Sequence, residues 1–129
     1  MKTVIITRKK QLANALLPYW IIPAQAVEQQ PAHFQTPGQV RLDAAGHPRP
    51  TLNPESLAEI GAPVRNGETV TLALPDGVRQ IYAVTMDGLL SNPADISWER
   101  EVFRFTILTK GGFVRPPHPI IEAEQEGSA

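Results

Sequence analysis

The chain has no cysteine, few aromatic side chains and almost no net charge, and each shortage narrows the range of functions. Without cysteine there is no disulfide framework, thiolate nucleophile or cysteine-based metal site. The formal net charge of -1 gives no overall attraction to nucleic acid or to an acidic membrane. No apolar run reaches the ~18 residues expected of a membrane-spanning segment. A cysteine-free chain fits a reducing cytoplasm, which is the compartment we expect.

Groups suited to catalysis or metal binding are also scarce. The three histidines, His33, His47 and His118, lie in proline-rich stretches without the close spacing of a zinc-binding pair. Asp76 and Asp87 are each followed by glycine, which is typical of turns rather than of a catalytic carboxylate pair. There is no nucleophile elbow and no glycine-rich phosphate loop. We therefore assign no catalytic residue, metal or cofactor, and whether the protein is an enzyme stays open.

What the chain does contain is a series of short β-prone segments separated by turn signals. The clearest are Lys2–Arg8, Tyr19–Pro23, the alternating Val70, Leu72 and Leu74, and the segment 101–109. Because such segments are short and helical patterns are few, they predict a mainly β fold. We expect a small antiparallel β-sandwich with one short helix and a long proline-rich insertion.

The stretch from Asn66 to Gly88 carries the strongest of these signals. It predicts two strands that fold into a hairpin about Pro75, Asp76 and Gly77. Proline presets the first turn angle, and we expect Gly77 to adopt a positive φ where the hairpin closes.

At 129 residues there is room for one domain, which we expect to span residues 1–121. The proline-rich insertion covers 24–63, because its prolines rule out a long helix and most central strands. A short helix is predicted near 54–60, capped by Asn53 and ended by Gly61. The acidic segment 122–129 is predicted to be a flexible tail.

Residues 1–26 allow two interpretations. Basic residues, an apolar stretch and the final Ala24-Gln25-Ala26 resemble a secretory signal, which would make the protein an exported cell-surface domain. Pro18, Tyr19 and Trp20 interrupt the apolar stretch, however, and the first residues are β-branched. We favour two strands and keep secretion as the alternative.

Three segments resemble a known group of domains. These are "NGETVTLALPDGVRQIYA", the opening "VIITRKKQLANALLPYWII" and the Ser91-Asn92 turn. Together they are similar to small bacterial β-sandwich domains related to the PEGA type, over about half of the chain. The resemblance implies an accessory or binding module without a shared catalytic site, in which residues 24–63 are an insertion. It transfers no functional residue.

We therefore expect a non-enzymatic module that binds another protein, because a small sandwich with uncovered edges can accept a partner strand. The expected contacts lie in the two proline-rich regions. An equal alternative is that Phe34 and Phe113 only plug the edge of the core. The expected contact residues are His33, Phe34, Phe113, Arg115 and His118.

Two further hypotheses remain open. Arg8, Lys9 and Lys10 form the one compact basic cluster and could belong to a basic patch that binds nucleic acid. A solvated turn explains the cluster more simply, so we expect no nucleic-acid partner. The other hypothesis is a small ligand-binding or hydrolytic domain with the 24–53 loop as a lid, which requires a deep, partly polar pocket.

Overall fold

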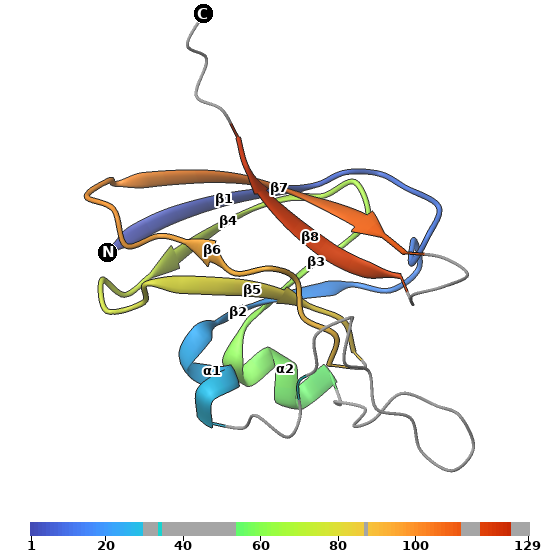
Figure 1. The fold of residues 1–129 in the computed structure, drawn as a ribbon, viewed down its shortest axis with the longest axis horizontal. Coiled ribbons are helices and arrows are strands. Elements are labelled where there is room, and N and C mark those ends of the chain that lie inside the picture. The colour runs from blue at the N-terminus through green and yellow to red at the C-terminus, as the bar shows by residue number, and fades with distance from the viewer. Residues whose placement is uncertain (30–33, 35–53, 87, 112–116, 125–129) are drawn as a thin grey trace, which may run out of the picture.

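The protein is built mainly from β-strands, as predicted, and two short helices accompany them (Figure 1). The computed structural model describes residues 1–29, 34, 54–86, 88–111 and 117–124. In chain order the elements are β1 (Lys2–Arg8), β2 (Tyr19–Pro23), α1 (Ala24–Gln29), α2 (Pro54–Ile60), β3 (Ala62–Val64), β4 (Thr69–Leu74), β5 (Gln80–Val84), β6 (Ala94–Asp95), β7 (Val102–Lys110) and β8 (His118–Ala123).

The first sheet has the order β4-β1-β7-β8. β1 pairs antiparallel with β4 on one side and parallel with β7 on the other, and β8 returns antiparallel beside β7. The parallel pair departs from the wholly antiparallel arrangement that the sequence predicts. It arises because the chain crosses to the other sheet four times between β1 and β7, so β7 enters beside β1 from a distant position.

The second sheet has the order β3-β2-β5-β6 and is antiparallel throughout. It forms the lower layer in Figure 1, with both helices beneath it. β5 is therefore covered on both faces. Its Ile81 and Ala83 belong to the core between the sheets, whereas Val84 packs in a second cluster with Trp20 and Leu57.

The main core draws on both sheets, and β1 shows how. Val4 and Ile6 are fully buried, and their partners on β7 are Phe103 and Phe105. The same face of β1 also carries a cation at each end, Lys2 and Arg8, and both are buried. Strand alternation places these four β1 side chains on one face, because successive residues point to opposite sides of a sheet.

The two buried cations join the sheets through main-chain carbonyls. The Lys2 ammonium donates to the carbonyls of Val78 (3.0 Å) and Ile96 (2.6 Å). At the other end, Arg8 donates to the carbonyl of Val64 on β3 (3.0 Å). A buried charge is tolerated only where hydrogen bonds replace its lost water. These carbonyls provide such bonds, although the buried Nε of Arg8 has no hydrogen-bond partner among the described residues.

The predicted hairpin about Pro75 is wrong. β4 pairs with β1 in one sheet, and β5 pairs with β2 and β6 in the other, so the turn is a corner between the layers. Its main-chain bond from Val78 N to Pro75 O (3.0 Å) is present, but Gly77 does not have a positive φ. The turn residues identify the corner, whereas long-range packing decides which strands pair.

Other expectations are partly met. α2 spans the residues where a helix is predicted, whereas α1 has no counterpart among the predicted elements. β8 continues to Ala123, so the predicted tail begins later than residue 122. β1 and β2 both lie within the segment weighed as a secretory signal. No helix in the described part of the chain is long and apolar enough to cross a bilayer.

Candidate functional site

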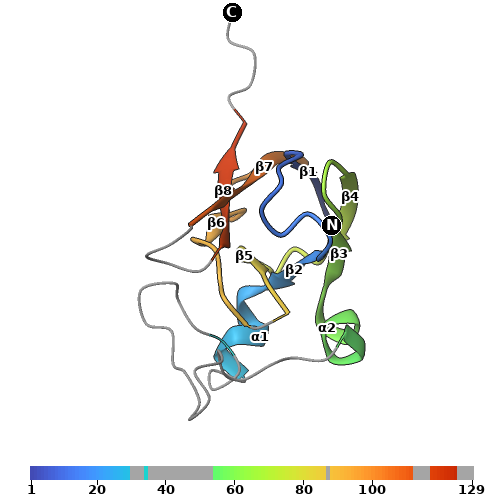
Figure 2. The same cartoon turned by 90° about the vertical axis from the view of Figure 1, so that its right-hand side faces the viewer.

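Among the described strands, β4 has the most open edge. β4 pairs with β1 on one side, and no described strand pairs with its other side. The main-chain bond from Arg8 N to Glu68 O (2.9 Å) shows which residue pairs of β1 and β4 are hydrogen-bonded, because such pairs alternate along an antiparallel ladder. Residues 70, 72 and 74 therefore direct their N–H and C=O groups toward β1. The same groups of Thr69, Thr71 and Ala73 point away from β1. β4 itself lies at the right-hand margin of Figure 2.

An apolar groove runs beside this edge, between β4 and the second sheet. It has a volume of about 260 Å³. The inward side chains of β4, Val70, Leu72 and Leu74, are only half-buried although they pack against the main core. Residues 71–74 of β4 line the groove. The rest of the lining comes mainly from β2, the end of α2 and β5: Ile21, Ile22, Pro23, Ile60, Gly61, Ala62 and Ile81.

The other three sheet edges each carry a feature that hinders strand addition. On β8, Pro119 lacks an N–H donor, and the Asn92 side chain occupies both outward groups of Ile121. Its Nδ2 donates to Ile121 O (2.8 Å), and its Oδ1 accepts from Ile121 N (2.9 Å). β3 has only three residues and contains Pro63, and the two-residue β6 follows Pro93. Such devices are how natural sheets protect their edges.

A second exposed feature is the β1–β2 connection, residues 9–18, which we call the leucine loop. The exposed fraction of the side chain is 97% at both Leu12 and Leu16, and 47% at Leu17. The loop lies at the right-hand end of Figure 1 and faces the viewer in Figure 2. Single exposed leucines are common on protein surfaces, whereas three in one loop make this loop a candidate contact surface.

Arg8 fixes the base of the leucine loop. Its side chain is 1% exposed, and its Nη atoms donate to the carbonyls of Leu17 (2.6 Å) and Asn14 (2.8 Å) as well as to that of β3. The guanidinium carbon lies 3.9 Å from the centre of the Tyr19 ring, a cation–π distance. The pKa of Arg8 is lowered from its ordinary value, because the lowering by burial is larger than the raising by the charge of Tyr19. The expected solvated turn is therefore wrong for Arg8, whereas Lys9 and Lys10 are exposed.

Further hydrogen bonds hold the rest of the loop. Gln11 pairs with the main chain of Thr109 through both amide atoms (2.7 and 3.2 Å), and its own N–H donates to Asn66 Oδ1 (3.0 Å). Asn14 adopts a left-handed conformation with φ 58°. Its Nδ2 donates to the hydroxyl of Tyr19 (3.1 Å), which hydrogen-bonds to Thr109 Oγ1 (2.7 Å). The exposed leucines thus project from an ordered support.

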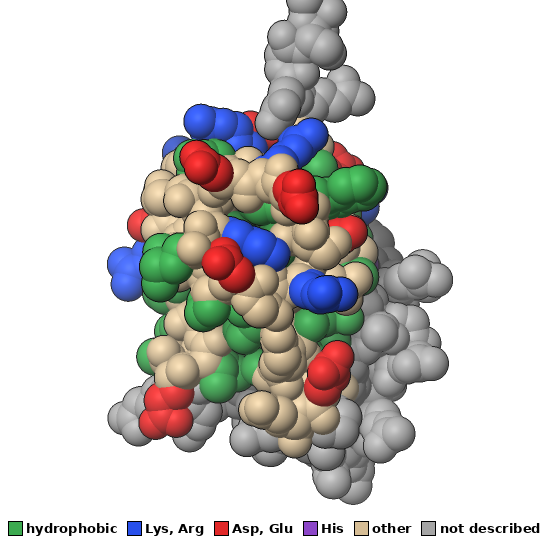
Figure 3. Space-filling model, turned by 90° about the vertical axis from the view of Figure 1, so that its left-hand side faces the viewer, with side chains coloured by type: hydrophobic (Ala, Val, Ile, Leu, Met, Phe, Trp, Pro, Cys, Tyr) green, Lys and Arg blue, Asp and Glu red, His purple; other side chains and the backbone are tan. Residues whose placement is uncertain are grey.

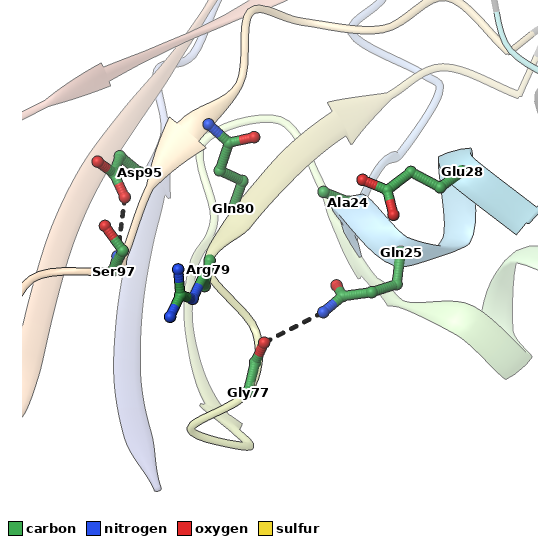
Figure 4. A pocket seen from close by; sticks show the side chains of 8 residues that line it. All are labelled: Ala24, Gln25, Glu28, Gly77, Arg79, Gln80, Asp95 and Ser97. Carbon is green, nitrogen blue, oxygen red and sulfur yellow. Dashed lines mark hydrogen bonds between the residues drawn. The ribbon is translucent and has the colours of Figure 1, made fainter.

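A polar hollow of about 360 Å³ lies where α1 approaches the β4–β5 corner (Figure 4). Gln25 Nε2 donates to the Gly77 carbonyl across it (3.2 Å). Asp95 accepts a hydrogen bond from Ser97 N (2.8 Å). The Ser97 side chain and N–H are the largest causes that hold the pKa of Asp95 below its ordinary 3.8, with smaller help from Lys2 and Arg79. An ionised, exposed carboxylate of this kind is poorly suited to general acid–base chemistry near neutral pH.

Another hollow, of about 260 Å³, opens between β6 and the β7–β8 pair. The buried rings of Phe103 and Phe105 line it, and the exposed Trp98 stands beside it. Among the described residues, no group of three or more His, Asp or Glu side chains could hold a metal ion. The polar hollow does bring the Ser97 hydroxyl beside Asp95, but the lowered pKa makes this carboxylate a weak base.

The residues singled out in the sequence do not form one site. Phe34 is 8% exposed and packs with Trp20, Ile22 and Leu57, a placement typical of a core side chain. His118 is buried at the start of β8, opposite Lys110. His33, Phe113 and Arg115 lie outside the described residues, as does the predicted 24–53 lid apart from α1 and Phe34. A contact role for these five residues stays a prediction.

Sequence reasoning missed two features for which signals were present. Arg8 has the same strand parity as Val4 and Ile6, so alternation alone indicates an inward side chain. From the sequence, the leucines of the loop are read only as part of the apolar stretch of a secretory signal. The openness of the β4 edge has no local signal, because it depends on which strands pair.

Comparison of the chain with protein-family models, curated proteins and solved structures finds no match. The resemblance to PEGA-type domains therefore stays a prediction.

Proposed function

We propose that this protein is a non-enzymatic interaction module that binds another protein by accepting an extended segment along β4. The observation that carries the proposal is the contrast between the edges. β4 offers six proline-free residues, three of which direct their N–H and C=O groups outward, whereas the described edges at β3, β6 and β8 are short, contain proline or are occupied by Asn92. An open edge of this kind is a template for strand addition.

The groove beside β4 supports the same proposal. A strand added to an edge places alternate side chains on the inner face, and here that face adjoins an apolar groove of about 260 Å³. We infer that the partner segment carries apolar residues at every second position. Its main-chain bonds would contribute about 0.5–1.5 kcal/mol each, and the apolar side chains would add selectivity.

Two other considerations agree with this proposal without testing it. The PEGA-type resemblance implies accessory or binding modules, which is the class proposed. The cytoplasm is the proposed compartment, because a chain without cysteine has no need of an oxidising one.

The test compares Thr71→Pro with Thr71→Val. The Thr71 N–H points away from β1, so proline removes an outward donor without breaking a β1–β4 hydrogen bond, and prolines are tolerated on edge strands. Valine keeps the N–H and the β-branched shape and is the matched control. Both variants should unfold at nearly the same denaturant concentration as the parent.

Tagged parent and variants are then used to capture proteins from lysate of the source cells at high salt, with quantitative mass spectrometry as the readout. We expect a protein that the parent and Thr71→Val retain and Thr71→Pro loses. Retention at high salt is expected because main-chain bonds and apolar contacts are weakly screened. Capture that is equal for all three proteins would refute binding at this edge.

A further inference from the structure

The charges around the leucine loop are mostly of one sign. Lys9 and Lys10 belong to the loop itself. Gln11 hydrogen-bonds to Asn66 and Thr109. Arg65 and Lys110, their neighbours in the sequence, therefore lie close to the loop. On the loop and these two attached turns, the described residues include four exposed cations and one exposed carboxylate, that of Glu68.

The opposite end of the molecule differs. Figure 3 shows acidic and basic side chains interspersed over it. The described residues there include Asp76, Asp95 and Glu101 as well as Arg79 and a mostly buried lysine. The chain is nearly neutral overall, yet the three exposed leucines occupy a cationic end.

We propose that the leucine loop docks on an anionic lipid surface, with Leu12 and Leu16 entering the boundary between headgroups and acyl chains. Lys9, Lys10 and Lys110 then face the anionic headgroups. Long apolar side chains projecting beside lysines are the arrangement that binds at a membrane interface. The site is separate from the β4 edge.

Three observations favour lipid over a protein groove. The leucine side chains are 97% exposed at two positions and project outward from the loop, so they can enter a fluid phase without a matching cavity. The loop has no aromatic side chain, whereas protein hot spots are enriched in tryptophan, tyrosine and arginine and poor in leucine. The surrounding charge complements the negative cytoplasmic leaflet.

The hydrogen bonds at the base of the loop make this docking efficient. Arg8 and Asn14 hold the main chain that carries the leucines, so little conformational entropy is lost on insertion. Because Leu12, Leu16, Lys9 and Lys10 are all exposed, replacing them should leave the fold intact. Binding and folding can therefore be measured separately.

The experiment is co-sedimentation of the full chain with vesicles of phosphatidylcholine alone, or of phosphatidylcholine with phosphatidylserine. We expect binding only to the phosphatidylserine vesicles, and we expect it to weaken as salt is raised. The double variant Leu12→Ser/Leu16→Ser should bind about a hundredfold more weakly. Lys9→Gln/Lys10→Gln should lose about thirtyfold.

Two controls give the test its specificity. Arg79→Gln/Arg104→Gln removes two exposed cations away from the loop and should leave vesicle binding unchanged. Thr71→Pro should also bind vesicles normally, so failure of the β4 proposal and failure of this one are distinguishable. The proposal is overturned if the parent does not bind vesicles that contain phosphatidylserine, or if the leucine double variant binds them as well as the parent does. The proposal is also overturned if the parent does not bind vesicles but binds an acidic protein that requires the leucines. The loop would then be assigned to protein recognition.

Discussion

Replacing Arg8 by methionine should destabilise the protein strongly, because the guanidinium makes three described hydrogen bonds to main-chain carbonyls in a site that is 1% exposed. A hydrogen bond to a charged group contributes about 1.5–3 kcal/mol. The sum is reduced by the cost of keeping a guanidinium away from water. We therefore expect Arg8→Met to lower the free energy of unfolding by about 3–4 kcal/mol.

The neighbouring position provides a matched control. Lys9 is exposed, so Lys9→Met should change the free energy of unfolding by no more than about 0.5 kcal/mol. Arg8→Lys should recover only part of the loss, because an ammonium cannot reach all three carbonyls with the planar geometry of arginine.

The assay is urea unfolding followed by circular dichroism. For a protein of this size, 3–4 kcal/mol corresponds to a decrease of about 2 M in the urea midpoint at an unchanged slope. The reasoning is refuted if Arg8→Met and Lys9→Met unfold at the same midpoint, since the carbonyl network would then contribute nothing to stability.

Three other predictions test the fold and its electrostatics. Gly61→Ala should unfold several °C below the parent in a thermal scan, because its Cβ would overlap a β2 carbonyl, whereas Gly77→Ala, with nothing within 4 Å and no positive φ, should match or slightly exceed it. Phe34→Ala should cost about 3–5 kcal/mol in denaturant unfolding while leaving partner capture intact, and a binding defect without loss of stability would show that Phe34 is a contact. Ser97→Ala should raise the pKa of Asp95 toward 3.8 in a carboxyl NMR titration. The lowered pKa means that Asp95 stabilises the fold above its unfolded pKa and loses this effect as the pH falls through its folded pKa, so the variant should weaken that dependence; an unmoved pKa would contradict the assigned cause.

The strands that carry their own signal could be predicted from the sequence. β1, β2, β4, β5 and β7 are β-branched or alternating, and α2 has proline at its first position and glycine after its end. These signals are local, so they do not depend on which other elements the strands pack against.

The missed features depend on distant parts of the chain. β8 contains Pro119 and is not among the strands predicted from the sequence, because its pairing with β7 cannot be read from its own residues. The residues of the turn at Pro75 are typical of a hairpin, but β4 pairs with β1 and β5 pairs with β2, so the two flanking strands do not pair with each other. Gly61 was read as a helix stop, whereas its close approach to β2 is what excludes a side chain.

The candidate site was even less accessible to sequence reasoning. An open edge is defined by what does not pair with it, and the Asn92 side chain that occupies the β8 edge lies 29 positions from its partner. The sequence leaves a contact role and a core role for Phe34 equally open, and the burial of its side chain agrees with the core role.

Amide hydrogen exchange of β4, measured by NMR on the free protein and on its complex with the captured partner, tests the central claim most directly. In the free protein, the outward amides of Thr69, Thr71 and Ala73 should exchange quickly, and the amides of residues 70, 72 and 74 slowly. On binding, the three outward amides should become protected while the others change little. If the partner binds and those three amides still exchange quickly, strand addition at β4 is wrong.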